Sequence, residues 1–200
     1  MKIGILISGR GSNMVAITAA VQSATIPDSK VAVVISDKSK AVGLKKAESL
    51  GIETLAVTRK KRSREAHDAE IIEELKKRGV ELVCLAGYMR LLSSDFVRAF
   101  PNRILNIHPS LLPSFKGLDA HQQAIDYGVK ISGCTVHFVD EHLDHGAIIL
   151  QKAVEVKDDD TADTISKRII KYEHESYVEA VRRIAAGEIE IDGRRVITRY

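Results

Sequence analysis

The fold is decided by Lys2-Ile3-Gly4-Ile5-Leu6-Ile7-Ser8-Gly9-Arg10-Gly11-Ser12-Asn13, an apolar strand-like run followed by a glycine-rich turn that opens a helix. Further strand-like runs follow, with helical patterns between most of them. They are Val31–Ile35, Thr54–Val57, Leu82–Leu85, Ile104–Ile107 and Thr135–Val139. Strands that alternate with helices form parallel sheets covered by helices. The sequence therefore predicts an α/β fold: an open, mostly parallel twisted sheet with helices on both faces.

Helical periodicity places the remaining elements. One helix face is marked by Val42, Ala47 and Leu50 before Gly51, and another by Ala66, Ala69, Ile72 and Leu75 before Gly79. The longest helix is predicted from Asp160 or Thr161 to about Ala186, and a hairpin turning at Asp192-Gly193 follows it. Residues 109–118 contain two prolines and a glycine that suit neither a helix nor a central strand, so we expect a covering loop there.

Length and composition bound the class of protein. A chain of 200 residues with 44% hydrophobic and 28% charged residues suits one globular domain spanning residues 1–200. A net charge of +3 is too small to indicate nucleic-acid binding. The sequence contains no apolar run of the roughly 18 to 20 residues that a membrane span needs, and no signal peptide, so we expect a cytoplasmic protein without a membrane partner. We interpret Cys84 and Cys134 as buried thiols.

The turn from Ser8 to Asn13 is a candidate anion site. Glycines allow backbone amides to approach a phosphate closely, and the N-terminus of a helix favours negative charge. The turn lacks the third glycine of a dinucleotide fingerprint and the Gly-Lys-Ser/Thr of a P-loop, so neither a dinucleotide nor a nucleoside triphosphate is indicated. The alternative is a tight turn with Ser12 as the helix N-cap. The basic run Arg59–Arg64 is likewise either a solvated loop before a helix or an attraction for an anionic ligand.

Asn106 and His108 form a second candidate site. Residues two apart in a strand project to the same face, and Pro109 ends the strand at its carboxyl end, where open parallel sheets bind ligands. The pair suits catalysis, although a histidine at a strand end is also commonly structural.

Asp140-Glu141-His142-Leu143-Asp144-His145-Gly146 contains the third candidate site. It is either a solvated acidic turn or the source of a carboxylate that orients His108 and favours its charged form. A metal site built from His142, Asp144 and His145 matches no standard spacing, so we expect no metal.

Four motifs together resemble the folate-dependent phosphoribosylglycinamide formyltransferases, over essentially the whole chain. They are Ile-Ser-Gly-x-Gly-Ser-Asn from Ile7, Leu-Ala-Gly-Tyr-Met-Arg from Leu85, Asn-Ile-His-Pro-Ser-Leu-Leu-Pro from Asn106 and Leu-Asp-His-Gly from Leu143. The resemblance implies a Rossmann-like formyltransferase fold. It also implies formyl transfer from the co-substrate 10-formyltetrahydrofolate to the amine of glycinamide ribonucleotide, in de novo purine biosynthesis.

The resemblance also implies site residues. Contacts to glycinamide ribonucleotide would come from Gly11, Ser12, Asn13 and Glu173. The folate would contact Arg64, Met89, Arg90, Leu91, Leu92, Val97, Asn106, Asp140, Glu141, His142, Leu143 and Asp144. The chain departs from the family at Ile170, where a polar residue is common, and at His145, where glycine is common.

Catalysis is assigned to Asn106, His108 and Asp144. Asn106 would stabilise the oxyanion, His108 would act as general acid and Asp144 would keep His108 charged. An amine is already a nucleophile, so neither a covalent intermediate nor a metal is required. We expect residues 109–118 and 140–146 to move on binding. The sequence leaves open whether the protein is a monomer or a homodimer.

Three alternatives compete with this interpretation. A formyltetrahydrofolate hydrolase would use the same catalytic residues, but we expect it to carry an extra N-terminal domain, whereas Met1 here opens the first strand. A methionyl-tRNA formyltransferase would have a C-terminal tRNA domain in place of the short hairpin. A non-catalytic module that binds a sugar phosphate would explain Gly11 to Asn13 but would leave Asn106, His108 and Asp144 without a purpose.

Overall fold

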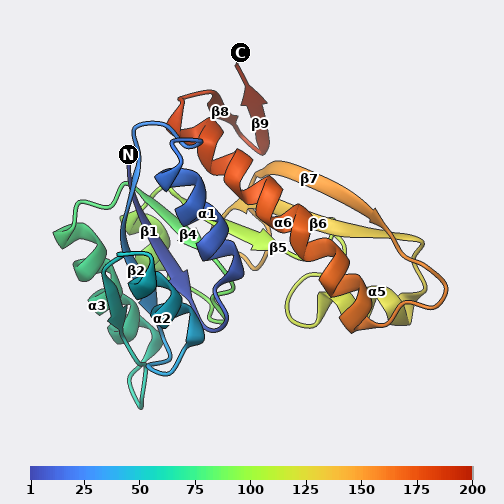
Figure 1. Cartoon of the computed structure of the whole chain (residues 1–200), viewed down its shortest axis with the longest axis horizontal. Helices are drawn as coiled ribbons and strands as arrows, with labels where there is room; N and C mark the ends of the chain where they lie inside the picture. Colours follow the sequence, from blue (N-terminus) through green and yellow to red (C-terminus); the bar gives the residue numbers. More distant parts are fainter. Residues whose placement is uncertain (200) are drawn as a thin grey trace. The chain divides into compact units, whose positions relative to one another are not determined.

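The computed structural model describes Met1–Arg199 (Figure 1). By internal contacts the chain divides into a first unit, Met1–Asn106, and a second unit that begins at Ile107. The single domain expected from chain length therefore stays a prediction. No helix within residues 1–199 is both long and apolar enough to cross a membrane.

The first unit holds a parallel sheet in the order β3-β2-β1-β4-β5. Its strands are β1 (Lys2–Ile7), β2 (Lys30–Ser36), β3 (Thr54–Ala56), β4 (Leu82–Leu85) and β5 (Ile104–His108), which runs on into the second unit. Its helices are α1 (Ser12–Gln22), α2 (Val42–Ser49), α3 (Arg64–Lys77) and α4 (Ser94–Ala99). These bounds confirm the parallel strands that the apolar runs predict.

Helices cover both faces of this sheet, as predicted. Gly4 and Ile7 are three residues apart in β1, so they face opposite sides of the sheet. A Cβ at Gly4 would lie 2.5 Å from Leu75 of α3, which places α3 on one face. A Cβ at Gly43 of α2 would lie 2.5 Å from the end of Ile7, which places α2 on the other. Both glycines therefore lie where a helix approaches β1 closely.

The buried face of α3 differs from the prediction. Ala66 and Ala69 are exposed, whereas His67 and Asp68 are buried beside Ile71 and Leu75. The two polar side chains are buried because each has a hydrogen-bond partner from another segment. His67 Nε2 lies 2.7 Å from the Val57 carbonyl, and Asp68 Oδ2 accepts the Ser93 amide at 2.6 Å.

The second unit contains an antiparallel pair, β6 (Ile131–Phe138) and β7 (Ile148–Glu155), packed against the long helix α6. Figure 1 draws α6 in red alongside the orange β7. The remaining elements are α5 (Ala120–Tyr127) and the hairpin strands β8 (Ile189–Asp192) and β9 (Arg195–Thr198). The sequence interpretation missed β7 and began β6 four residues late. β7 is largely solvent-facing, so it lacks the continuous apolar run of the buried strands.

The long helix and the hairpin were predicted correctly. α6 spans Ala162–Ala185, with Thr161 as its N-cap and a capping box that pairs Thr161 with Thr164. Asp192 pairs with Arg195 across the hairpin, so the turn residues are Gly193 and Arg194, one residue later than the predicted turn at Asp192-Gly193. Cys84 and Cys134 are buried free thiols, as expected.

Candidate active site

The glycine-rich turn between β1 and α1 presents the amino end of a helix. Gly11 is the N-cap, with a φ of 67°, and a Cβ there would lie 3.1 Å from the Gly43 backbone. The alternative that Ser12 is the N-cap is therefore wrong, because the cap position falls on Gly11, whose left-handed backbone conformation favours glycine. The first helical hydrogen bond runs from the Val15 amide to the Gly11 carbonyl. The backbone amides of the first helical turn, which precede Val15, are the groups that a helix N-terminus presents to an anion.

The loop of residues 109–118 is tied to β6 and β7 by a buried polar network. Thr135 Oγ1 donates to the Ser110 carbonyl at 2.7 Å and accepts the Leu112 amide at 3.1 Å. Gln151 donates to the Leu112 carbonyl at 2.9 Å. The start of the predicted covering loop is thereby fixed in place, directly after His108.

His108 and Asp144 lie together in the second unit. His108 Nδ1 is 3.4 Å from Asp144 Oδ2, and both side chains are more than 90% buried. The other ring nitrogen, Nε2, lies 2.8 Å from the Phe115 carbonyl. Asp144 also accepts the Gly117 amide at 2.8 Å, from the same loop. The structure thus brings together two residues that are far apart in the sequence, and the loop that contributes Phe115 and Gly117 encloses them.

His137 is a neighbour of Asp144 that the sequence analysis did not single out. Its Nε2 lies 3.8 Å from Asp144 Oδ1, while its Nδ1 lies 2.7 Å from the Phe138 carbonyl. Burial lowers the pKa of His137, and the nearby Asp144 charge only partly opposes that effect. A neutral His137 donates through Nδ1 to Phe138, so it does not compete with His108 for the carboxylate. His137 lies on β6, opposite Ile148 of β7, and no pattern in the sequence indicates that it neighbours Asp144.

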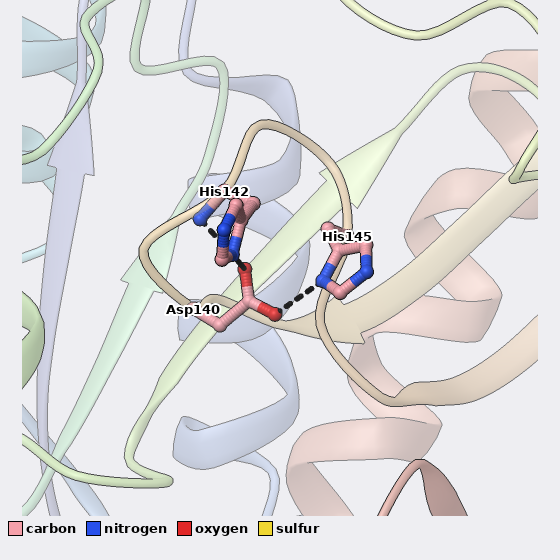
Figure 2. Close-up of side chains that lie close together, drawn as sticks. All are labelled: Asp140, His142 and His145. Carbon is pink, nitrogen blue, oxygen red and sulfur yellow. Dashed lines mark hydrogen bonds and ion pairs between the residues drawn. The ribbon is translucent and has the colours of Figure 1, made fainter.

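The loop after β6 folds around Asp140 (Figure 2). Asp140 Oδ2 lies 2.7 Å from His145 Nδ1, and Oδ1 accepts the His142 amide at 2.9 Å. Burial raises the pKa of the Asp140 carboxyl, but these hydrogen bonds and the nearby imidazoles outweigh it and hold the pKa below its usual range. The histidine cluster therefore forms with Asp140, whereas the sequence interpretation had grouped it with Asp144. Glu141 and Leu143 are exposed.

A cavity of about 500 Å³ opens in the first unit between α3 and the segment after β4. Four of the predicted folate contacts line it, and they are Arg64, Met89, Arg90 and Leu91. Leu92 and Val97, which are half-buried, lie outside this lining. Arg90 Nε donates to the buried Asp37 at 2.6 Å. The basic run contributes Arg59 and Arg64 to the cavity.

The remaining predicted residues lie on β5 and α6. Asn106 is half-buried in β5, two residues before His108, so the two side chains leave the same face of the strand. Glu173 is buried on α6, with 7% of its surface exposed. Together with burial, which is the larger cause, its charge raises the pKa of the Cys134 thiol to about 11. Glu173 is therefore a carboxylate held inside the second unit.

Comparisons with known proteins match most of the chain. Residues 1–181 match the formyl transferase family model. The chain is 46% identical to the trifunctional purine biosynthetic protein adenosine-3 of Bos taurus over 95% of its own length, which spans 19% of that protein. It is 42% identical to phosphoribosylglycinamide formyltransferase of Bacillus subtilis, over 92% of the chain and 94% of that protein.

The structure matches as closely as the sequence. Glycinamide ribonucleotide transformylase 1 of Symbiobacterium toebii superimposes with a TM-score of 0.98 at 50% identity, over 100% of this chain and 94% of that one. The mostly parallel sheet, the helices and the motifs therefore agree with the matched family. The chain belongs to the formyl transferase family.

Proposed function

We propose that this protein transfers the formyl group of 10-formyltetrahydrofolate to the amine of glycinamide ribonucleotide, a step of purine biosynthesis. The observation that carries the proposal is the match to a phosphoribosylglycinamide formyltransferase, at 42% identity over 94% of that protein. We place the reaction in the cytoplasm and assign the protein no metal cofactor.

The ribonucleotide would bind at the start of α1. Its phosphate suits the amides of Gly11, Ser12 and Asn13, because a helix N-terminus provides both donors and a favourable dipole. Glu173, a carboxylate, suits the glycinamide part of the same substrate.

The folate would take the cavity lined by Arg64, Met89, Arg90 and Leu91, together with Leu92, Val97 and Asn106. Arg64 suits the anionic glutamate tail, and the apolar side chains suit the flat ring system. We also assign folate contacts to the loop Asp140–Asp144 of the second unit.

The chemistry is direct attack of the amine on the formyl carbon. The new C–N bond forms as the carbonyl becomes an oxyanion, which an amide donor such as Asn106 stabilises. The carbonyl then re-forms as the bond to the folate nitrogen breaks. That nitrogen takes a proton from His108, and the former amine gives up a proton to water. A general acid of this kind contributes about 10² to 10⁴ in rate.

The surroundings of His108 support the role of general acid. Carboxylate and carbonyl oxygens face its two ring nitrogens, at 3.4 Å and 2.8 Å. Only the doubly protonated ring can donate to both oxygens. Before it could protonate a substrate through Nε2, His108 would have to leave the Phe115 carbonyl, so the part of the loop 109–118 around Phe115 would move on binding while its start stays anchored.

The decisive experiment measures tetrahydrofolate release from 10-formyltetrahydrofolate, with and without glycinamide ribonucleotide. We expect release that requires the ribonucleotide and falls by about 10² to 10⁴ in His108→Ala. The control is Asp158→Asn, on a surface carboxylate with 90% of its side chain exposed. Release without the ribonucleotide would identify a hydrolase, and no release at all would favour a sugar-phosphate-binding module.

Asp144→Asn tests the pairing of Asp144 with His108. Removing the carboxylate charge 3.4 Å from His108 Nδ1 should lower the rate and flatten or displace the fall in activity at rising pH. A pH profile that is unchanged in this variant would contradict the pairing, even if the transferase activity itself is established.

A further inference from the structure

We propose that Asp140, His142 and His145 form a binding site for a divalent transition-metal ion such as Zn²⁺. The three residues lie within the six-residue segment 140–145, and their ligand atoms all lie within 4.8 Å of one another. Figure 2 shows both imidazoles beside the one carboxylate. Asp144, another carboxylate of the loop, is engaged by His108 and Gly117 and takes no part.

The spacing of the ligand atoms suits a metal ion. Bond lengths of about 2.0 to 2.2 Å in a tetrahedral site place neighbouring ligand atoms about 3.4 Å apart. Here the two imidazole Nδ1 atoms lie 2.7 Å and 3.8 Å from the Asp140 carboxylate oxygens, values on either side of that spacing. The two imidazole rings are 5.1 Å apart between centroids. Side-chain adjustments of less than about 1 Å would therefore close the site around an ion.

The ligand types select the class of ion. Two imidazoles and one carboxylate suit Zn²⁺ and its transition-metal neighbours, whereas Mg²⁺ and Ca²⁺ prefer ligands that are all oxygen. Three protein ligands leave a coordination position for water or an external ligand. The side chain of His142 is 76% exposed, so an ion can enter from solvent.

Arg194, in the turn of the β8–β9 hairpin, disfavours binding of the metal ion. Its guanidinium lies 2.8 Å from His145 Nε2 and 3.2 Å from Nδ1, and it donates to the His145 carbonyl at 2.9 Å. A metal bound to His145 Nδ1 leaves the ring proton on Nε2. That N–H would then face the Arg194 guanidinium, which can only donate hydrogen bonds. Arg194 would have to withdraw, and its positive charge also disfavours a cation nearby. Its removal should therefore strengthen metal binding.

Metal binding has a consequence for catalysis that rests on the proposed function. The loop Asp140–Asp144 carries proposed folate contacts, and an ion that joins Asp140 to His142 and His145 would hold it in one conformation. We expect Zn²⁺ to inhibit formyl transfer by competing with the folate, and a chelator to reverse the inhibition.

The test titrates the protein with ZnCl₂ by calorimetry and with CoCl₂ by visible absorption, which reports the coordination geometry of the bound ion. Saturable binding of one ion per chain is expected. His142→Ala and His145→Ala should each weaken it by about 10- to 100-fold or more, since even outer partners of a metal site contribute that much. The matched control is His174→Gln, because His174 lies on α6 outside the cluster. Arg194→Gln should bind the ion more tightly than the wild type.

Two results would overturn the proposal: no saturable binding to the wild-type protein, or equal affinity in the wild type and both histidine variants. Thermal unfolding of each variant would separate loss of ligands from loss of fold. Binding without any formyl transfer would leave the metal site standing and defeat the proposed function. Formyl transfer without metal binding would support the proposed function and overturn the metal site.

Discussion

Replacing Gly146 with alanine is expected to move the loop that holds Asp144. Gly146 lies two residues after Asp144, where the chain returns toward β7 and passes against the end of β6. An added Cβ would lie 1.9 Å from the Phe138 carbonyl oxygen and 2.7 Å from its carbon. Both are backbone atoms, so the contact cannot be relieved by a side-chain rotation.

The size of the effect follows from that distance. To bring the contact from 1.9 Å to even 3.0 Å, the two segments must separate by at least 1.1 Å. A displacement of about 1 Å at catalytic groups can lower the rate by about 10²-fold. Overpacking of this kind costs about 1 to 3 kcal/mol, less than the roughly 5 to 15 kcal/mol that keeps a domain folded. The variant should therefore be folded but slow.

The assay is the ribonucleotide-dependent release of tetrahydrofolate, measured together with urea unfolding. Gly9→Ala is the matched control for stability, because a Cβ there meets no atom within 4 Å. If Gly146→Ala retained activity within about threefold of the wild type, the argument from loop position would be refuted, since a 1 Å shift is expected to cost about 10²-fold.

Two further predictions concern stability. Burial lowers the pKa of His137 below its ordinary 6.5, so the unfolded chain takes up this proton first and stability is lost as pH falls below about 6.5. His137→Asn should reduce that slope by up to about 1.4 kcal/mol per pH unit in urea unfolding at pH 5 to 7, and an unchanged slope would exclude the histidine as its source. Asp68→Ala should cost about 1 to 3 kcal/mol, because the Ser93 amide loses its buried acceptor at 2.6 Å. The exposed Asp158→Ala should change stability by less than about 0.5 kcal/mol, and equal effects of the two substitutions in denaturant unfolding would contradict the role of burial.

The elements that could be predicted from the sequence are those whose own residues determine them. β1 and β4 are short, almost entirely apolar runs, and such runs indicate strands buried on both faces. The length of α6 follows from its periodicity and its cap at Thr161. β7 was not predicted because it is largely exposed and so lacks an apolar run. Its exposure results from its place at one side of an antiparallel pair, and a local sequence pattern does not show where a strand lies in a sheet.

The buried face of α3 shows the same limit within a helix. Alanine and isoleucine spacing indicated a face through Ala66 and Ala69, yet His67 and Asp68 are the buried residues. Their burial depends on acceptors and donors supplied by Val57 and Ser93, which lie in other segments. Hydropathy assigns polar residues to the surface unless such partners are known.

By itself, the sequence determined the parallel α/β architecture of the first unit, the glycine-rich start of α1 and the motifs that identify the family. These features depend on local hydrophobic period, on backbone conformations that favour glycine and on conspicuous strings of residues. Only the tertiary structure decided that Asp144 lies 3.4 Å from His108 and that Asp140 lies close to both His142 and His145. The physical reason is that chain spacing does not fix the direction of a side chain on an irregular loop. That direction is set by contacts from distant residues, here the Gly117 amide on Asp144 and Arg194 on His145.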